Sequence, residues 1–480
     1  MKKWTKILCS AVGGVLGLGF LLTGCATVGD IKNPSNEVVF NGNSAVMIDG
    51  HLYYGNSFAD ISTFSNDDSY KSSAKLSYLA RLNTNASSFA TDGKDFSPEN
   101  VEKVAEKVAG HENSFMFALG NYIYYATPNR EEISNGDGTS SYQYSYTTLF
   151  RSKLNGDDVK EIYTTNGEIS QIEVLKYGGK YYVVIYAGTT LVKIEVGDKV
   201  GDVKTIAEDV TGVAMPETYQ QDKAGSTLDF NGYIYYTTAR TVEDYANASG
   251  TQFNRVLLTS DSGEKMSATT SSISLIGREK DVVFFTKDGA TYSVNVANNA
   301  SKNIFTDNGN ATRLYNGSVT DLDLIASDNV DYGYIFKSSE TLMYKEVNAS
   351  ATSVKFVDGE GAEITDYNFL AADGTVRYIS TTTGIYKADF ATISNGSITC
   401  DTIVKMTGIH DGSLYAYDGK YIYFYAQLQD LEDKAEEDAS ITETDANYYL
   451  YRAKADVNPK ATSKTTYELL SLTETDERHS

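Results

Sequence analysis

The feature that most constrains the fold is a short strand-like run that recurs along the chain. Each copy places Tyr, Val, Ile or Phe behind a turn of Asn, Asp or Gly, as hairpin-rich β proteins do. The eight copies are residues 50–54, 121–125, 180–184, 232–236, 281–285, 332–336, 375–379 and 421–425. The later copies are about 44 to 51 residues apart, which indicates one repeat domain instead of about three separate domains.

A second strand with a recognisable ending follows each run, as in residues 149–157 and 449–456. Repeats of ~40–50 residues that hold four strands each are typical of a β-propeller. A single sheet of this kind cannot bury both faces, so a ring of stacked sheets supplies the core. We therefore predict an all-β chain with a single β-propeller over residues 38–472 and a disordered tail at 473–480. Eight four-stranded blades are expected, with seven blades and one decorating hairpin as the alternative.

One segment tests the repeat against local periodicity. Val101, Val104 and Val108, preceded by a proline and followed by Gly110, match an amphipathic helix. Residues 104–110 nevertheless align with residues 206–212, and both precede a tyrosine-rich run by a similar interval. Because a repeated position should keep a repeated structure, we predict an outer strand here.

The N-terminus has the three parts of an export signal. A basic head with three lysines precedes an apolar stretch of 16 residues, 7–22, which is shorter than the ~20 residues that span a bilayer. The stretch ends in Leu22-Thr23-Gly24-Cys25, which resembles the lipobox of bacterial lipoproteins. An ordinary signal peptide, or a membrane anchor with a chance cysteine, is the alternative.

The lipobox resemblance implies a location for the protein. Residues 1–24 would be removed as a signal peptide, and Cys25 would carry a diacylglycerol thioether and further acyl chains such as palmitate, which hold a protein stably at a membrane. The protein is then expected at the extracytoplasmic face of the cell membrane. Residues 25–37 would form a flexible tether, and a dozen residues reach about 40 Å at ~3.3–3.6 Å each.

The repeats also resemble the propeller modules of the low-density-lipoprotein-receptor type. Those modules carry a Tyr-Trp-Thr-Asp strand and then a strand that ends in an Asp-Gly turn. Residues 235–238 and 124–127 stand where that motif would, and residues 154–157 supply the turn. No copy has the tryptophan, and Tyr or Phe takes its place in most copies, so the resemblance is to a divergent bacterial form found in lipoproteins.

Long loops mark a candidate binding face. Connections between the second and third strands leave from one face of a propeller, and they are long after copies one, two, four and eight. If the ring closes, copies eight, one and two are neighbours, and loops on a rigid scaffold often carry binding residues. The candidate partner-binding residues are Tyr142, Tyr144, Tyr146, Phe58, Phe64 and Tyr70, and the acidic loop holds Asp430, Glu432, Asp433, Glu436, Glu437 and Asp438. The tyrosines could instead pack on a neighbouring loop, and the acidic run could be a solvated loop.

The net charge and the motifs that the sequence lacks argue against several functions. The net charge of −23 argues against nucleic-acid binding and against electrostatic docking on anionic lipid. The four histidines show no metal-binding spacing, and we find no phosphate-binding loop or nucleophile elbow, so no metal or cofactor is expected. Cys400, in a strand-like setting, is expected to be a buried residue and not a nucleophile.

Two hypotheses about function follow. The first is a lipid-anchored, monomeric propeller that binds a protein or glycan through the long loops and is not an enzyme. The second is an enzyme that acts on a polysaccharide or another polymer with carboxylates in the propeller cleft. A solute-binding lipoprotein of an importer would share the N-terminus, but it needs alternating strands and helices, which the hairpins contradict.

Overall fold

A computed structural model describes the ring of strands and leaves out both ends of the chain. It describes residues 37–41, 45–55, 79–84, 101–105, 115–134, 140–165, 169–216, 230–240, 249–296, 311–327, 330–339, 341–346, 349–371, 374–382, 384–405, 409–428, 448–455 and 467–472. The predicted signal peptide, Cys25 and the C-terminal tail therefore lie outside the described residues. Within the described ranges, none of the helical structure has the length and apolar character that crossing a bilayer requires.

The first half of the chain forms four antiparallel sheets, numbered here in chain order. Sheet 1 contains β2 (Ala45–Ile48), β3 (His51–Gly55), β4 (Leu79–Asn83) and β5 (Val101–Ala105). Sheet 2 contains β6 (Met116–Leu119), β7 (Tyr122–Ser134), β8 (Ser140–Lys153) and β9 (Lys160–Thr164), with β1 (Val38–Val39) added beside β6. Sheet 3 contains β10 (Ile169–Tyr177), β11 (Lys180–Ala187), β12 (Thr190–Val196) and β13 (Lys204–Ala207), and sheet 4 contains β14 (Val210–Ala214), β15 (Tyr233–Ala239), β16 (Thr251–Leu257) and β17 (Glu264–Thr269).

The second half repeats this pattern and adds one further sheet. Sheet 5 contains β18 (Ile273–Glu279), β19 (Val282–Lys287), β20 (Ala290–Asn295) and β21 (Thr312–Tyr315), and sheet 6 contains β22 (Thr320–Ser327), β23 (Val330–Ser338), β24 (Thr341–Glu346) and β25 (Thr352–Ser353). Sheet 7 contains β28 (Asn368–Ala371), β29 (Val376–Ser380), β30 (Gly384–Asp389) and β32 (Asp401–Lys405), and sheet 8 contains β33 (Ile409–Tyr417), β34 (Tyr421–Leu428), β35 (Tyr448–Lys454) and β36 (Tyr467–Leu472). The ninth sheet contains β26 (Lys355–Val357), β27 (Glu363–Ile364) and β31 (Ser397–Thr399), next to the short helix η4 (Phe390–Thr392).

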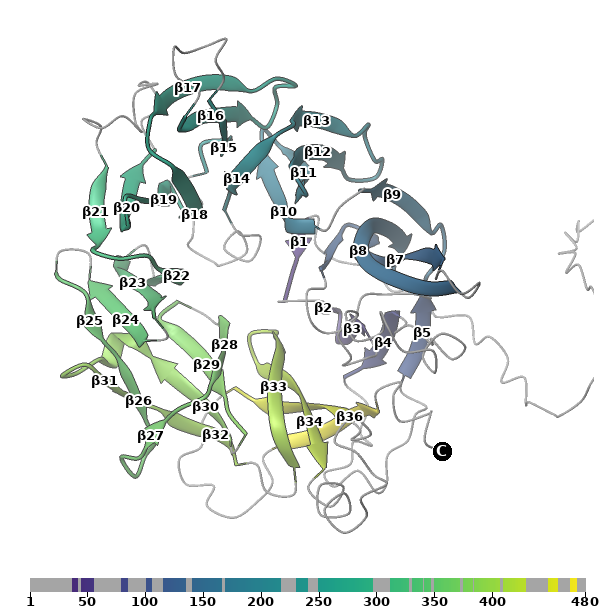
Figure 1. Cartoon of the computed structure of the whole chain (residues 1–480). Coiled ribbons are helices and arrows are strands. Elements are labelled where there is room, and N and C mark those ends of the chain that lie inside the picture. The colour runs from purple at the N-terminus through teal and green to yellow at the C-terminus, as the bar shows by residue number, and fades with distance from the viewer. Residues whose placement is uncertain are drawn as a thin grey trace, which may run out of the picture.

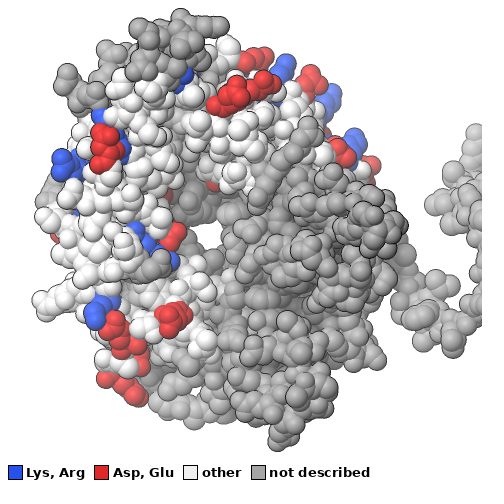
Figure 2. All heavy atoms as spheres, viewed as in Figure 1, with Lys and Arg blue, Asp and Glu red and all other residues white. Residues whose placement is uncertain are grey.

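The sheets are arranged around a central axis, so the chain is a single all-β propeller (Figure 1). The first strand of each four-stranded sheet lies on the inner side, and neighbouring first strands such as β14 and β18 contact each other. All eight recurring runs form second strands, as the repeat predicted. The space-filling view shows an opening at the centre and interspersed acidic and basic side chains along the outer edge (Figure 2).

The ambiguous segment at residue 101 is a strand, which confirms the prediction from the repeat. β5 pairs antiparallel with β4, with Val101 opposite Leu82.

The turn residues also adopt the backbone conformations that their types favour. In the β19–β20 hairpin, Asp288 and Gly289 have φ of 50° and 75°, the positive values that a two-residue hairpin turn requires at both central positions.

The expected number of blades was wrong, because the described residues form nine sheets in place of eight or seven. The ninth sheet packs between sheets 6 and 7, where Phe356 and Ile398 share one buried cluster with Ile335 and Ile379. Its strands are two or three residues long, and β26 pairs in parallel with β31. Strands this short show no alternation, so the repeat did not reveal them.

Candidate binding face

The antiparallel order of the strands divides the loops between two faces of the ring. Each first strand ends at a hairpin turn on one face, and the third strand ends on that same face. We call this the turn face; Asp49–Gly50 and Gly178–Gly179 lie on it. The opposite face, which we call the insertion face, carries the connections from second to third strands, including those that leave after Gly55 and Leu428.

Ring closure brings three of the long insertions together at their strand ends. The Tyr425 hydroxyl near the end of β34 donates a buried 3.0 Å hydrogen bond to the carbonyl of Gly55, from which the first insertion leaves. Leu79, where that insertion returns, shares a buried cluster with Met116 and Tyr125 of sheet 2. The strand ends of sheets 8, 1 and 2 are therefore neighbours, which confirms the predicted closure of the ring between copies eight, one and two.

The long hairpin of β7 and β8 belongs to sheet 2, at one end of this group of three sheets. Pairing continues past the body of sheet 2 to Ser134 and Ser140, with Tyr144 opposite Arg130 and Tyr142 opposite Glu132. The register shifts between Thr127 and Asn129, so Tyr146 lies at a bulge, which increases the local twist. The three tyrosines are thus strand residues, but their side chains lie outside the described part of the structure. The candidates Phe58, Phe64 and Tyr70 and the acidic loop Asp430, Glu432, Asp433, Glu436, Glu437 and Asp438 also lie outside it.

A recurring contact on the turn face was missed by the sequence analysis. In five neighbouring pairs of sheets, a side chain of one sheet donates a hydrogen bond to a backbone carbonyl of the next sheet. The carbonyl belongs each time to the residue that directly follows the third strand. We call these bonds turn-face clamps: Arg452 Nη1 to Thr84 (2.8 Å), Tyr53 Oη to Leu154 (2.9 Å), Arg151 Nη1 to Gly197 (2.9 Å), Lys193 Nζ to Leu258 (2.7 Å) and Asn231 Nδ2 to Val296 (2.9 Å). They join sheets 8, 1, 2, 3, 4 and 5 in an unbroken arc that includes the ring closure.

Stacking on tyrosine holds the cationic side chains in place. The Arg151 guanidinium lies 4.1 Å from the ring centre of Tyr122, and that of Arg452 lies 4.5 Å from Tyr421. In both sheets the arginine is directly opposite the second tyrosine after the turn, as in the pair Tyr124 and Arg151. A basic residue shared by the third-strand endings was the signal in the sequence, since Arg81, Arg151, Arg255 and Arg452 occupy this register.

Burial of the tyrosine hydroxyls changes their acidity. Desolvation raises the pKa of Tyr125 to about 12. The pKa of Tyr423 is also raised, first by desolvation and then by Asp418, which accepts its hydroxyl hydrogen at 2.7 Å. Both hydroxyls stay protonated at neutral pH, and that of Tyr423 donates a hydrogen bond to Asp418.

A buried arginine links the inner strand β22 of sheet 6 to sheet 7. Asp323 of β22 accepts two hydrogen bonds from the Arg377 guanidinium, at 2.8 and 2.6 Å, and the arginine side chain is 1% exposed. No cluster of three metal-ligating side chains occurs in the part of the chain that the structure covers. Cys400 is a buried free thiol, as predicted, and desolvation raises its pKa to about 12, so it is a poor nucleophile.

Comparison with known proteins adds distant structural similarity. No protein-family model matches the chain, and no curated protein matches it in sequence. The C-terminal WD40 domain of Sif2 aligns with 82% of this chain and 96% of its own, at 13% identity and a TM-score of 0.39. Hsv2 of Kluyvelomyces marxianus aligns with 77% of this chain and 97% of its own, at 11% identity and a TM-score of 0.36. The propeller assignment rests on the strand pairing itself.

Proposed function

We propose that the protein is a lipid-anchored binding propeller at the extracytoplasmic face of the membrane, and that its partner is a protein or a glycan. The partner binds the group of insertions at the strand ends of sheets 8, 1 and 2. Lipid attachment at Cys25 follows the lipobox resemblance, and the scaffold resembles a divergent low-density-lipoprotein-receptor-type propeller. The proposed activity is binding, without a catalytic step.

The observation that carries this proposal is the hydrogen bond from Tyr425 to Gly55, which joins the first and last sheets at the insertion strand ends. A rigid ring holds these ends at fixed positions, and loops on such a scaffold are suited to recognition. Tyrosine offers large contact area with few rotatable bonds, which favours its use in binding. The paired β7–β8 extension presents three of them on one hairpin.

Photo-crosslinking in the native cells tests the proposed binding region. A crosslinking amino acid at position 144 should give a discrete adduct with a protein, or a glycan-dependent mobility shift. The matched control is position 288, in the short β19–β20 turn on the same face of sheet 5. Equal crosslinking from both positions, or none from 144, would contradict the proposed region.

A separate measurement tests the anchor. The wild-type protein should partition into the detergent phase of a cell extract, and Cys25→Ser should move it to the aqueous phase. A substitution of the buried thiol, Cys400→Ala, serves as the control and should leave partitioning unchanged. If Cys25→Ser partitions like the wild type, the anchor is not at Cys25.

A further inference from the structure

The described chain begins on the turn face. β1 pairs antiparallel with β6, with Val38 opposite Leu119, the last residue of β6 before its turn. Glu37, one residue earlier, accepts a 2.6 Å hydrogen bond from the ammonium of Lys176, two residues before the Gly178–Gly179 turn. The hydroxyl of Tyr181, two residues after that turn, also donates to Glu37. Three contacts from two sheets therefore place the end of the tether at the turn face.

The tether is short compared with the height of the ring. Eleven residues lie between Cys25 and Glu37, and a flexible chain of that length has a root-mean-square span of roughly 20 Å. β10 has nine residues, so at ~3.3 Å per residue the ring is about 30 Å high. A bilayer beside the insertion face would require the tether to extend past the whole ring, at a cost in chain entropy. A bilayer beside the turn face imposes no such cost.

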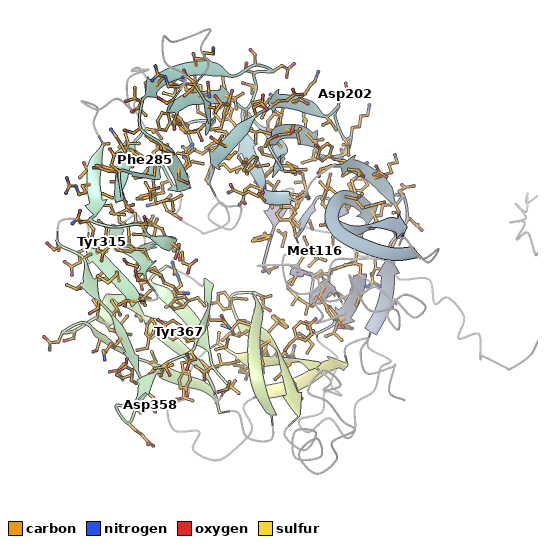
Figure 3. The ribbon with its side chains drawn as sticks, viewed as in Figure 1. Met116, Asp202, Phe285, Tyr315, Asp358 and Tyr367 are labelled. Atoms are coloured by element: carbon orange, nitrogen blue, oxygen red, sulfur yellow. The ribbon has the colours of Figure 1, made fainter. Side chains whose placement is uncertain are left out.

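Exposed apolar side chains independently mark the same face. Among the described residues, Val159 and Val203 are the large hydrophobic side chains recorded as exposed, at 51% and 40%. Each lies between the third and fourth strands, in sheets 2 and 3, which are the sheets that hold β1 and Glu37. Each is preceded by an aspartate and followed by an exposed lysine. Figure 3 shows Asp202, the neighbour of Val203, at the outer rim of the ring.

We infer that the turn face lies against the lipid bilayer, with Val159 and Val203 at the headgroup region, and that the insertion face points away from the membrane. This inference rests on the proposed lipid anchor at Cys25. It gives the binding face free access to partners outside the cell. The tether and the two valines supply the contact, because the chain carries a net charge of −23 and gains nothing from anionic lipid.

Fluorescence energy transfer to the membrane tests the orientation. The full lipidated protein is reconstituted into phosphatidylcholine vesicles that contain an acceptor-labelled lipid. One variant carries a donor dye at Val203→Cys, and its matched control carries the dye at Thr189→Cys, at the other end of β12. The seven residues of β12 separate the two dyes by ~20 Å or more. Cys400 is 1% exposed, so the dye attaches to the introduced thiol.

The expected result is energy transfer at least twice as efficient from position 203 as from position 189. Greater transfer from 189, or equal transfer from both, overturns the orientation while the anchor remains supported. Absence of transfer from both positions, with the protein free in solution, overturns the anchor and the orientation with it. Both variants alter exposed positions, and an unchanged midpoint of chemical unfolding verifies the fold.

Discussion

At the scale of single residues, the ring depends on buried polar side chains that reach from one sheet to the next. Arg452 is 8% exposed, donates to the carbonyl of Thr84 and stacks on Tyr421. Replacing Arg452 with Ala leaves the Thr84 carbonyl without this donor, so we expect a loss of about 1–3 kcal/mol in the free energy of unfolding. Lys454→Ala, at an exposed position of the same strand, should change it by less than about 0.5 kcal/mol. Urea denaturation of both variants measures the difference, and equal losses would show that the clamp does not stabilise the ring.

The buried tyrosines predict sensitivity to alkali. The pKa of Tyr125 is about 12 in the folded chain and about 10 when unfolded. Below pH ~10 both states keep the proton, and the contribution to stability is fully present. As the pH rises from about 10 towards 12 the unfolded state loses its proton first, so the free energy of unfolding falls. Denaturation at a series of pH values should show this decline, and Tyr125→Phe should make it shallower; a flat profile for the wild type would contradict the assignment.

At the scale of elements, a turn of one sheet packs directly against a strand of the neighbouring sheet. Gly156, in the β8–β9 turn, has φ of +85°, and a Cβ placed there would lie 2.1 Å from the carbonyl oxygen of Val104 in β5. Gly156→Ala should therefore destabilise the protein by more than about 2 kcal/mol, from backbone strain and displacement of β5 together. Gly120→Ala has a similar positive φ, with open space around its Cβ, and should cost only about 1–2 kcal/mol. Thermal unfolding compares the two variants, and equal destabilisation would show that the close contact between Gly156 and β5 does not limit the side chain at this position.

At the scale of the whole molecule, the length of the tether controls how strongly the ring is oriented. Adding 24 Gly and Ser residues after Pro34 would raise the root-mean-square span to roughly 30–35 Å, which equals or exceeds the height of the ring. We expect the energy-transfer ratio between positions 203 and 189 to fall towards one, while the protein stays on the vesicles. An undiminished ratio would show that contact through Val159 and Val203, and not the tether, sets the orientation.

The sequence by itself determined the repeat, the place of each recurring run as a second strand, and the strand at Val101–Ala105. Alternation and turn residues are local signals, and eightfold repetition corrected a misleading helical pattern. It also placed the insertions on one face, although the side chains of Tyr142, Tyr144 and Tyr146 are not described. Only the tertiary structure decided the ninth sheet, the turn-face clamps and the face of the ring at which the described residues begin. Those features join residues such as Arg452 and Thr84, which are 368 positions apart, and no local pattern encodes which backbone carbonyl a side chain will meet.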